Sequence, residues 1–185
     1  ASFTGVYVGC MYNEFVAEMM NEGMSLSPQL ATGSGISFLV GRASYVFGFN
    51  GPCVSTDTAC SSSLVAVHLA RGALNGMECE RAVAGGVNLM LSWATTLSIC
   101  ILKALSIEGR CKTFDVSADG YGRGEGFAVA VVTRVPGAET NAIWTLRASG
   151  VNQDGRSSGL TAPNGPAQQA LIRHVLGRCM VDSSK

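Results

Sequence analysis

The chain has 185 residues, of which 47% are hydrophobic and 14% are charged, and its 13 Lys and Arg residues balance its 13 Asp and Glu residues. This length is enough for one domain with a substantial core, and the balanced charge gives no electrostatic basis for binding nucleic acid or an anionic membrane. Mean hydropathy is positive at +0.27, but no apolar run approaches the roughly 18 residues that a membrane-spanning helix needs.

The first half of the chain predicts strands and helices in alternation. Residues 3–9 have the composition of a strand, and residues 11–23 have that of a helix that ends at a glycine. In residues 35–49 the apolar side chains recur at helical spacing. Residues 51–56 predict a short strand after a Gly-Pro turn, and residues 60–75 predict a helix that an Asn-Gly pair brings to an end.

The second half continues this alternation. Residues 79–91 predict a buried strand, and residues 93–105 predict another helix. Two β-rich runs follow at 124–135 and 142–154, and the last helix is predicted over 165–180, with a proline suited to its first turn. Strands separated by helices indicate an α/β fold with a mainly parallel sheet.

The cysteine content bears on metal binding and on the compartment. The chain has seven cysteines: Cys10, Cys53, Cys60, Cys79, Cys100, Cys111 and Cys179. They form no CxxC pair and their number is odd, so the sequence predicts neither a metal site nor a disulfide framework, and it favours a reducing, cytoplasmic compartment. The chain opens with ASFTGVYVGC, without an initiator methionine or a signal-peptide pattern, and is therefore expected to be a segment of a longer protein.

One cysteine, Cys60, lies where a predicted strand gives way to a predicted helix, in the stretch DTACSSS (57–63). There its thiol would face unsatisfied backbone N–H groups and the positive end of the helix dipole, which favour the thiolate and lower the thiol pKa from its reference of about 8.5. The same N–H groups could stabilise the oxyanion that forms when a thiolate attacks a thioester. Small neighbours leave room for a bulky acyl carrier, and the apolar helix that follows is expected to be enclosed on all sides.

The residues alone also allow Cys60 to be a small core residue, because free cysteine is among the most buried residue types. The other six cysteines are assigned to packing. His68 lies later on the same predicted helix, about 12 Å along the axis and about 80° around it from Cys60, so it cannot reach the thiol and is assigned to the core. His174, on the last predicted helix, is assigned to the solvated surface. The candidate nucleophile therefore has no partner base among the two histidines.

Four blocks of the sequence resemble β-ketoacyl synthases, specifically the ketosynthase domains of type I modular polyketide synthases, which belong to the thiolase-like superfamily. The blocks are GPCVSTDTACSSSLVAVHLA (51–70), AVAGGVNLMLS (82–92), LSIEGRCKTFDVSADGYGRGEG (105–126) and VNQDGRSSGLTAPNGPAQQALIR (151–173). They follow the family's order over essentially the whole chain. The resemblance implies a thiolase-like layered α/β/α/β/α fold, incomplete here. In it, residues 1–185 would form a partial ketosynthase domain without its N-terminal start and without the C-terminal half that holds the catalytic histidines.

The resemblance also implies an acyltransferase of the 3-oxoacyl-[acyl-carrier-protein] synthase type, with Cys60 as nucleophile and a backbone N–H group as oxyanion donor. Cys60 would accept an acyl group from the phosphopantetheine arm of an acyl carrier protein. Decarboxylation of a malonyl carrier would then supply the carbanion that attacks this thioester and lengthens the chain by two carbons. No bound cofactor or metal is implied. The implied partners are the acyl carrier protein, an acyltransferase and other synthase domains of the parent chain, and a second ketosynthase in a homodimer of the complete domain.

The family decarboxylates with two histidines in motifs similar to EAHGTGT and KSNIGH, and neither motif occurs in this sequence. His68 and His174 match neither motif. The isolated chain is therefore expected to be a catalytically inert ketosynthase fragment, which an assay of carbon–carbon condensation would test.

Other conspicuous residues receive structural interpretations. Cys53 is expected on the strand that leads to Cys60, away from the chemistry. The segment GYGRGEG (120–126) lacks the spacing of a dinucleotide-binding loop, so its glycines predict a tight turn, with Glu125 as a structural anchor. Turn or capping roles are assigned to four carboxylates: Asp57, Asp115, Asp119 and Asp154.

Other classes of protein share some of these features. A ketosynthase of a fatty acid or polyunsaturated fatty acid synthase stays open, because only neighbouring domains would decide. The last two sequence blocks argue against thiolase-fold enzymes that use coenzyme A. A non-catalytic chain-length factor would lack the nucleophile, which is present here as Cys60, and a serine hydrolase is excluded because the chain has no GxSxG pentad.

Overall fold

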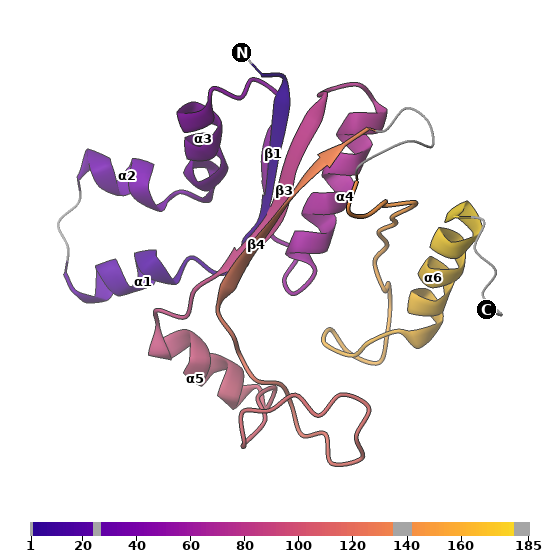
Figure 1. Cartoon of the computed structure of the whole chain (residues 1–185). Helices are drawn as coiled ribbons and strands as arrows, with labels where there is room; N and C mark the ends of the chain where they lie inside the picture. The colour runs from indigo at the N-terminus through magenta and orange to yellow at the C-terminus, as the bar shows by residue number, and fades with distance from the viewer. Residues whose placement is uncertain (1, 24–26, 135–141, 180–185) are drawn as a thin grey trace. The chain divides into compact units, whose positions relative to one another are not determined.

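The computed structural model describes residues 2–23, 27–134 and 142–179. The chain divides into two compact units, Ala1–Arg134 and Val135–Lys185. The first unit holds the sheet and five of the labelled helices, and the second holds helix α6, Gly165–Cys179 (Figure 1). None of the helices in the described ranges has both the length and the apolar character needed to cross a membrane.

The first unit is built on a four-stranded sheet with strand order β2-β1-β3-β4. Its strands are β1 (Thr4–Gly9), β2 (Cys53–Thr56), β3 (Arg81–Asn88) and β4 (Gly126–Thr133). β1 pairs in parallel with both β2 and β3, whereas β4 pairs antiparallel with β3. The mainly parallel sheet expected from the alternation of strands and helices is thus confirmed, and each predicted strand before residue 100 is found within a few residues of its expected position.

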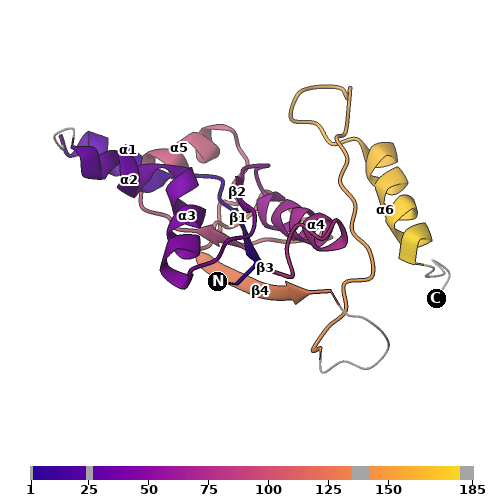
Figure 2. The same ribbon diagram turned by 90° about the horizontal axis from the view of Figure 1, so that it is seen from above.

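The helices of the first unit are α1 (Glu14–Asn21), α2 (Pro28–Ser34), α3 (Ile36–Phe47), α4 (Ser62–Asn75) and α5 (Trp93–Ile101). α3 and α4 lie on opposite faces of the sheet (Figures 1 and 2). α4 packs on β1 and β3, while α3 packs on β1 and β2. The central strand β1 is therefore covered on both sides, and the edge strand β4 has little cover on the α3 side.

The core between α4 and the sheet is made mainly of small side chains. Ala66, Ala70 and Ala73 of α4 are buried against Ala82 and Ala84 of β3. Tyr7, Leu74 and Cys79 complete this cluster. Because alanine has only a methyl group, the helix backbone can lie close to the sheet, and the first turn of α4 is held directly above the strand ends.

Two elements differ from the sequence prediction. The prediction lacks α2, although Ser27 accepts a hydrogen bond from the Leu30 N–H at 3.3 Å and Pro28 occupies the first turn, as at many helix starts. The prediction of a strand over 142–154 is wrong, because the structure has no strand in these residues. β-rich composition forms a strand only where a neighbouring strand pairs with its backbone groups, and none of the described strands pairs with this segment. Residues 135 and 180, at the ends of predicted elements, lie outside the described residues.

The helix after Cys60 also differs from its prediction in two ways. It begins at Ser62, so that Cys60 belongs to the preceding turn. It is not enclosed on all sides in the described part of the chain, because Leu64 is 73% exposed and Leu69 is 38% exposed, whereas Ala66 and Ala70 are fully buried. The sheet buries one side of α4 only.

The second unit is a loop that leads into α6. Asn164 precedes the helix, and its side-chain oxygen accepts a hydrogen bond from the Ala167 N–H at 3.2 Å. Asp154 in turn accepts from the Asn164 N–H at 2.8 Å, which confirms the structural role expected for this carboxylate. The predicted terminal helix is therefore confirmed, together with a cap that holds its start.

Candidate active site

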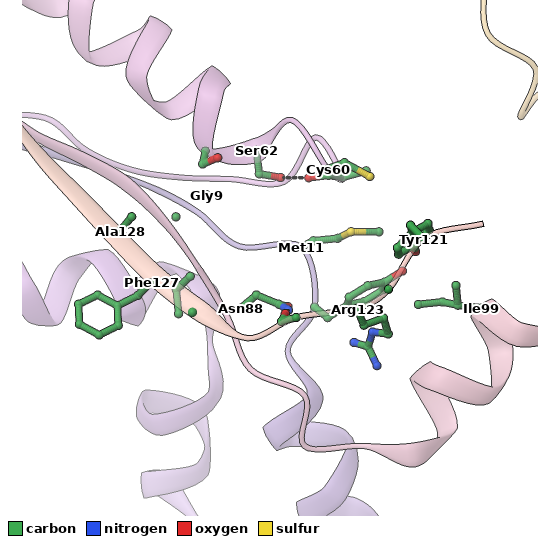
Figure 3. A pocket seen from close by; sticks show the side chains of 18 residues that line it. Gly9, Met11, Cys60, Ser62, Asn88, Ile99, Tyr121, Arg123, Phe127 and Ala128 are labelled. Carbon is green, nitrogen blue, oxygen red and sulfur yellow. Dashed lines mark hydrogen bonds between the residues drawn. The ribbon is translucent and has the colours of Figure 1, made fainter. Parts of the chain in front are cut away.

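The candidate site lies where three parallel strands end at one edge of the sheet. Gly9, the last residue of β1, pairs with Thr56 at the end of β2 and with Gly86 of β3. Side chains that follow these strands therefore converge, which is why binding sites in α/β folds form at the carboxyl ends of strands. Figure 3 shows Met11, Cys60 and Asn88 brought together in this way.

The turn that carries Cys60 is held by a dense set of hydrogen bonds. The Ser62 hydroxyl accepts from the Thr58 N–H at 2.9 Å and donates to the Ala59 carbonyl at 2.6 Å. Asp57 accepts from the Ala59 N–H at 3.0 Å, so its predicted turn role is confirmed. Ala59 has a φ of 57°, an unusual left-handed conformation for a residue with a Cβ. The chain reverses sharply there, and the exposed Cys60 side chain lines a cavity.

Two glycines allow this turn to lie against the sheet. A Cβ at Gly9 would lie 2.4 Å from the Ser62 carbonyl carbon and 2.5 Å from the Ser63 nitrogen. A Cβ at Gly86 would lie 2.7 Å from the Cβ of Ser63. Any larger residue at either position would displace the first turn of α4, so both glycines contribute to the position of Cys60.

Cys60 opens onto a cavity of about 510 Å³ whose exposed lining is mainly apolar (Figure 3). Its lining includes Met11, Tyr12, Ala59, Ser63, Asn88, Ile99, Tyr121, Arg123 and Phe127. Sequence reasoning found the cysteine and its turn but missed the opposite walls. Met11 and Tyr12 carried a usable signal, because they directly follow the first predicted strand. Tyr121 and Arg123 lie within the block for which the sequence predicts only a tight turn.

A buried ion pair supports the wall of the cavity that contains Arg123. The Arg123 Nη2 lies 2.6 Å from the Glu14 Oε1, and the two side chains are only 8% and 2% exposed. The other oxygen of Glu14 accepts from the N–H groups of Leu91 and Ser92, each at 2.7 Å. Burial by itself would raise the pKa of Glu14, but these backbone hydrogen bonds and Arg123 bring it below its ordinary value of 4.5. Glu14 is therefore a carboxylate at neutral pH.

Further contacts hold the segment around Arg123. The Glu125 Oε1 accepts from the Met90 N–H at 2.6 Å, which confirms Glu125 as a structural anchor. The Asn88 side chain donates to the Gly124 carbonyl at 2.6 Å. The pKa of the Tyr121 phenol is raised, first by burial and then by its electrostatic interactions with Cys60 and Tyr12. Tyr121 is thus a neutral phenol at neutral pH.

His174 occupies the environment expected for it, whereas His68, which was expected in the core, does not. His68 is half-buried on α4 and is not among the residues that line the cavity of Cys60. His174 is exposed on α6 in the second unit. Neither position identifies a histidine that could act as the base for Cys60.

The remaining cysteines only partly follow their assignment to packing. Cys79 is buried, and burial raises its pKa. Cys53 begins β2, as expected for the incoming strand, and accepts a hydrogen bond from the Ser44 hydroxyl at 3.4 Å. Cys53, Cys100 and Cys111 are exposed, so the assignment to packing is wrong for these three.

The other carboxylates singled out in the sequence stabilise loops. Asp115 accepts from the Ser117 N–H at 2.8 Å, as expected of a turn residue. Asp119 forms an ion pair with Lys112 at 3.1 Å. In the described parts of the chain, no three His, Cys, Asp or Glu side chains come together as a metal site.

A thiol on a strand-to-helix turn, at the edge of a mainly parallel sheet and beside an apolar cavity, suits an enzyme that holds acyl groups as thioesters. The family model described as "Beta-ketoacyl synthase, N-terminal domain" matches residues 1–138. Since this is more than half of the chain, the chain belongs to the β-ketoacyl synthase family.

Individual relatives narrow this to polyketide synthases. The chain is 47% identical over 178 residues to a phenolphthiocerol/phthiocerol polyketide synthase of Mycobacterium tuberculosis, an alignment that covers 94% of this chain and 8% of the relative. It is 43% identical over 178 residues to polyketide synthase GfsE of Streptomyces halstedii, with 95% of this chain and 5% of the relative covered. The chain thus spans less than a tenth of the length of either relative.

Solved ketosynthase structures share the fold. The oxazolomycin ketosynthase domain from Streptomyces albus JA3453 superposes with a TM-score of 0.87 at 36% identity, over 96% of this chain and 31% of that chain. The ketosynthase from module 6 of the bacillaene synthase of Bacillus subtilis gives 0.85 at 36% identity, over 97% of this chain and 31% of that chain. The resemblance to polyketide ketosynthases and the thiolase-like α/β fold class are both confirmed.

Proposed function

We propose that this chain performs the acyl-loading step of a β-ketoacyl-[acyl-carrier-protein] synthase in polyketide biosynthesis, with Cys60 as the nucleophile. One observation carries the proposal: the thiol is exposed on a rigid turn and opens onto a largely apolar cavity of about 510 Å³. An apolar cavity beside a fixed thiol suits an acyl chain held as a thioester.

In the loading step the Cys60 thiolate attacks the carbonyl carbon of an acyl thioester. The phosphopantetheine arm of an acyl carrier protein delivers this thioester, so no bound cofactor is needed. A new carbon–sulfur bond forms to Cys60, the bond to the pantetheine sulfur breaks, and the departing thiolate takes up a proton. A backbone N–H group at the Cys60 turn is the proposed donor to the transient oxyanion.

Condensation requires further groups. Removing CO2 from a malonyl carrier leaves a carbanion that must be stabilised while it attacks the Cys60 thioester. The two histidines of this chain occupy neither of the motifs that serve this purpose in the family. Residues 1–185 are therefore proposed to be a partial ketosynthase domain that loads an acyl group but does not condense it.

The proposed partners follow from this chemistry and from the relatives. The acyl carrier protein brings the substrate, an acyltransferase and other synthase domains belong to the parent chain, and the complete domain forms a homodimer. The relatives are polyketide synthases many times longer than this chain, which supports a multidomain parent. All seven cysteines are free thiols, which supports a reducing, cytoplasmic compartment.

Acyl loading is tested by incubating the chain with an acyl carrier protein that carries a butanoyl group and mapping the product by mass spectrometry. We expect one butanoyl group on the peptide that contains Cys60, none after Cys60→Ala, and an unchanged result after Cys53→Ala. Cys53 is the matched control because it is also exposed and lies on the strand that leads to Cys60. Acylation spread over several cysteines, or retained in Cys60→Ala, would refute the proposed nucleophile.

A further inference from the structure

Arg123 lies between two cavities. It lines the cavity of Cys60, and together with Tyr121 and Gly122 it also lines a second cavity of about 350 Å³. The second cavity is walled largely by apolar side chains, including Leu91, Trp93 and Leu105. These surroundings suit a hydrocarbon chain, but the Arg123 segment separates them from Cys60.

The guanidinium of Arg123 is fixed in place. Nη2 lies 2.6 Å from Glu14 and Nη1 donates to the Thr96 hydroxyl at 2.5 Å, so two different helices hold it. Glu14 is itself anchored by the N–H groups of Leu91 and Ser92 at the start of α5. If Arg123 swung away, the buried Glu14 carboxylate would lose its counter-charge, and that is strongly unfavourable. The Arg123 segment is therefore a rigid wall between the two cavities, and an acyl group cannot push its side chain aside.

We propose that Arg123, held by Glu14 and Thr96, is the specificity-determining partition that limits the length of the acyl group on Cys60. Short acyl groups fit within the first cavity, and longer ones meet the Arg123 segment before they reach the second. This inference rests on the proposed function, because it concerns the acyl group that Cys60 would carry.

Glu14 and Thr96 are positioning residues in this scheme. They contact neither the thiol nor the acyl group and act through the guanidinium that they hold. A buried ion pair gives little net stability, because desolvation of the two charges offsets their attraction. A role in shaping the cavity explains why such a pair lies beside the site.

The test compares short and long reagents on the same thiol. Cys60 is alkylated with N-butyl and N-decyl iodoacetamide and, separately, acylated with butanoyl and decanoyl thioesters of N-acetylcysteamine. The opening variant is Glu14→Gln with Arg123→Ala, which removes both buried charges together and leaves an amide oxygen for the Leu91 and Ser92 N–H groups. We expect its decyl-to-butyl rate ratio at Cys60 to rise about tenfold over the unchanged chain. The conservative single variant Arg123→Lys keeps a positive charge beside Glu14. Its decyl-to-butyl rate ratio should lie closer to that of the unchanged chain than the ratio of the double variant does.

Two further variants test whether a higher decyl-to-butyl rate ratio comes from opening the Arg123 wall or from a general loss of rigidity. Val40→Ala loosens the buried side of α3, away from both cavities, and should leave the ratio unchanged. Thr96→Val removes one hydrogen bond of Arg123 and should raise the ratio less than the double variant does, which keeps the test decisive if the double variant fails to fold. The inference would be overturned if the decyl-to-butyl rate ratio did not change in the double variant or in Thr96→Val. It would also be overturned if the ratio rose as much in Val40→Ala as in the double variant.

Alkylation of Cys60 needs no acyl transfer. The experiment can therefore refute the proposed acyl loading and the proposed role of Arg123 independently of each other. If the alkylation ratio rises but no thioester acylates Cys60, the partition stands and the proposed function fails. If thioesters acylate Cys60 and neither ratio responds to the double variant, the proposed function stands and the partition fails.

Discussion

The turn that carries Cys60 rests on glycines of the sheet, and a single added methyl group there should displace it. In Gly9→Ala the new Cβ would lie 2.4 Å from backbone of Ser62, which cannot swing away as a flexible side chain would. We expect a loss of about 1–3 kcal/mol in the free energy of unfolding, as for other overpacked sites. Denaturant melts measure the stability, and the rate of Cys60 alkylation reports the position of the turn.

Gly72→Ala is the matched control for that substitution. Gly72 lies in α4, and nothing lies within 4 Å of the position that its Cβ would occupy. Because alanine favours a helix over glycine, the free energy of unfolding should rise by about 0.5–1 kcal/mol, with no change in Cys60 alkylation. Equal losses of stability in the two variants would contradict the steric argument for Gly9.

Glu14 should make stability depend on pH in the acid range. Its pKa in the folded protein lies below the ordinary value of 4.5, so the unfolded chain binds its proton at a higher pH than the folded chain does. The stabilisation is therefore complete above that ordinary value and is lost as the pH falls through the lower folded pKa. At pH 7 Glu14→Gln should cost about 3–5 kcal/mol, because Arg123 stays buried without its counter-charge.

Thermal melts between pH 7 and pH 3 check this expectation. The gap in Tm between the unchanged chain and Glu14→Gln should narrow as the pH falls below about 4.5. A gap that stays constant would show that the carboxylate form of Glu14 contributes nothing to the stability.

At the scale of elements, β4 is the part of the sheet with the least cover. It is an edge strand, and Phe127, Val129 and Val131 alternate along the face on which α3 covers only β1 and β2. All three are exposed. A long apolar edge strand is a site of self-association, so we expect the 185-residue chain to elute from a size-exclusion column ahead of its 19.2 kDa monomer position.

Charges on β4 should reverse that behaviour. The double variant Val129→Lys with Val131→Lys should shift the elution toward the monomer, because lysines on an edge strand oppose strand pairing. Ile172→Lys, at an exposed apolar position on α6, is the control and should leave the elution unchanged. Elution of the unchanged chain as a monomer at micromolar concentration would contradict the prediction for β4.

At the scale of the whole molecule, acyl loading and condensation should be separable. Given a butanoyl group on Cys60 and a malonyl carrier protein, we expect the chain to keep its butanoyl thioester and to release no more CO2 than Cys60→Ala does. The physical reason is that neither His68 nor His174 lies in a decarboxylation motif. Mass spectrometry of the carrier measures any product, and a carrier-bound 3-oxohexanoyl group would show that the chain condenses after all.

Much of the fold could be predicted because its strands and helices carry local signals. The apolar run of β3 and the Gly-Pro turn before β2 are readable along the chain, as is the strand-to-helix turn at Cys60. The strand predicted over 142–154 failed for the opposite reason, since β composition alone supplies no partner strand. The exposure of Leu64 could not be predicted either, because an apolar helix does not reveal which of its sides a neighbour covers.

The sequence by itself determined the family, the candidate nucleophile and the order of most elements, because these depend on residue types at short spacing. Only the tertiary structure decided what surrounds the thiol. Glu14 and Arg123 are 109 residues apart in the chain, and nothing local to either residue indicates the other. Their contact exists because Glu14 follows the end of β1 while Arg123 precedes the antiparallel β4, whose start lies beside the end of β3 at the same edge of the sheet. Burial there makes a lone charge unfavourable and a matched pair acceptable.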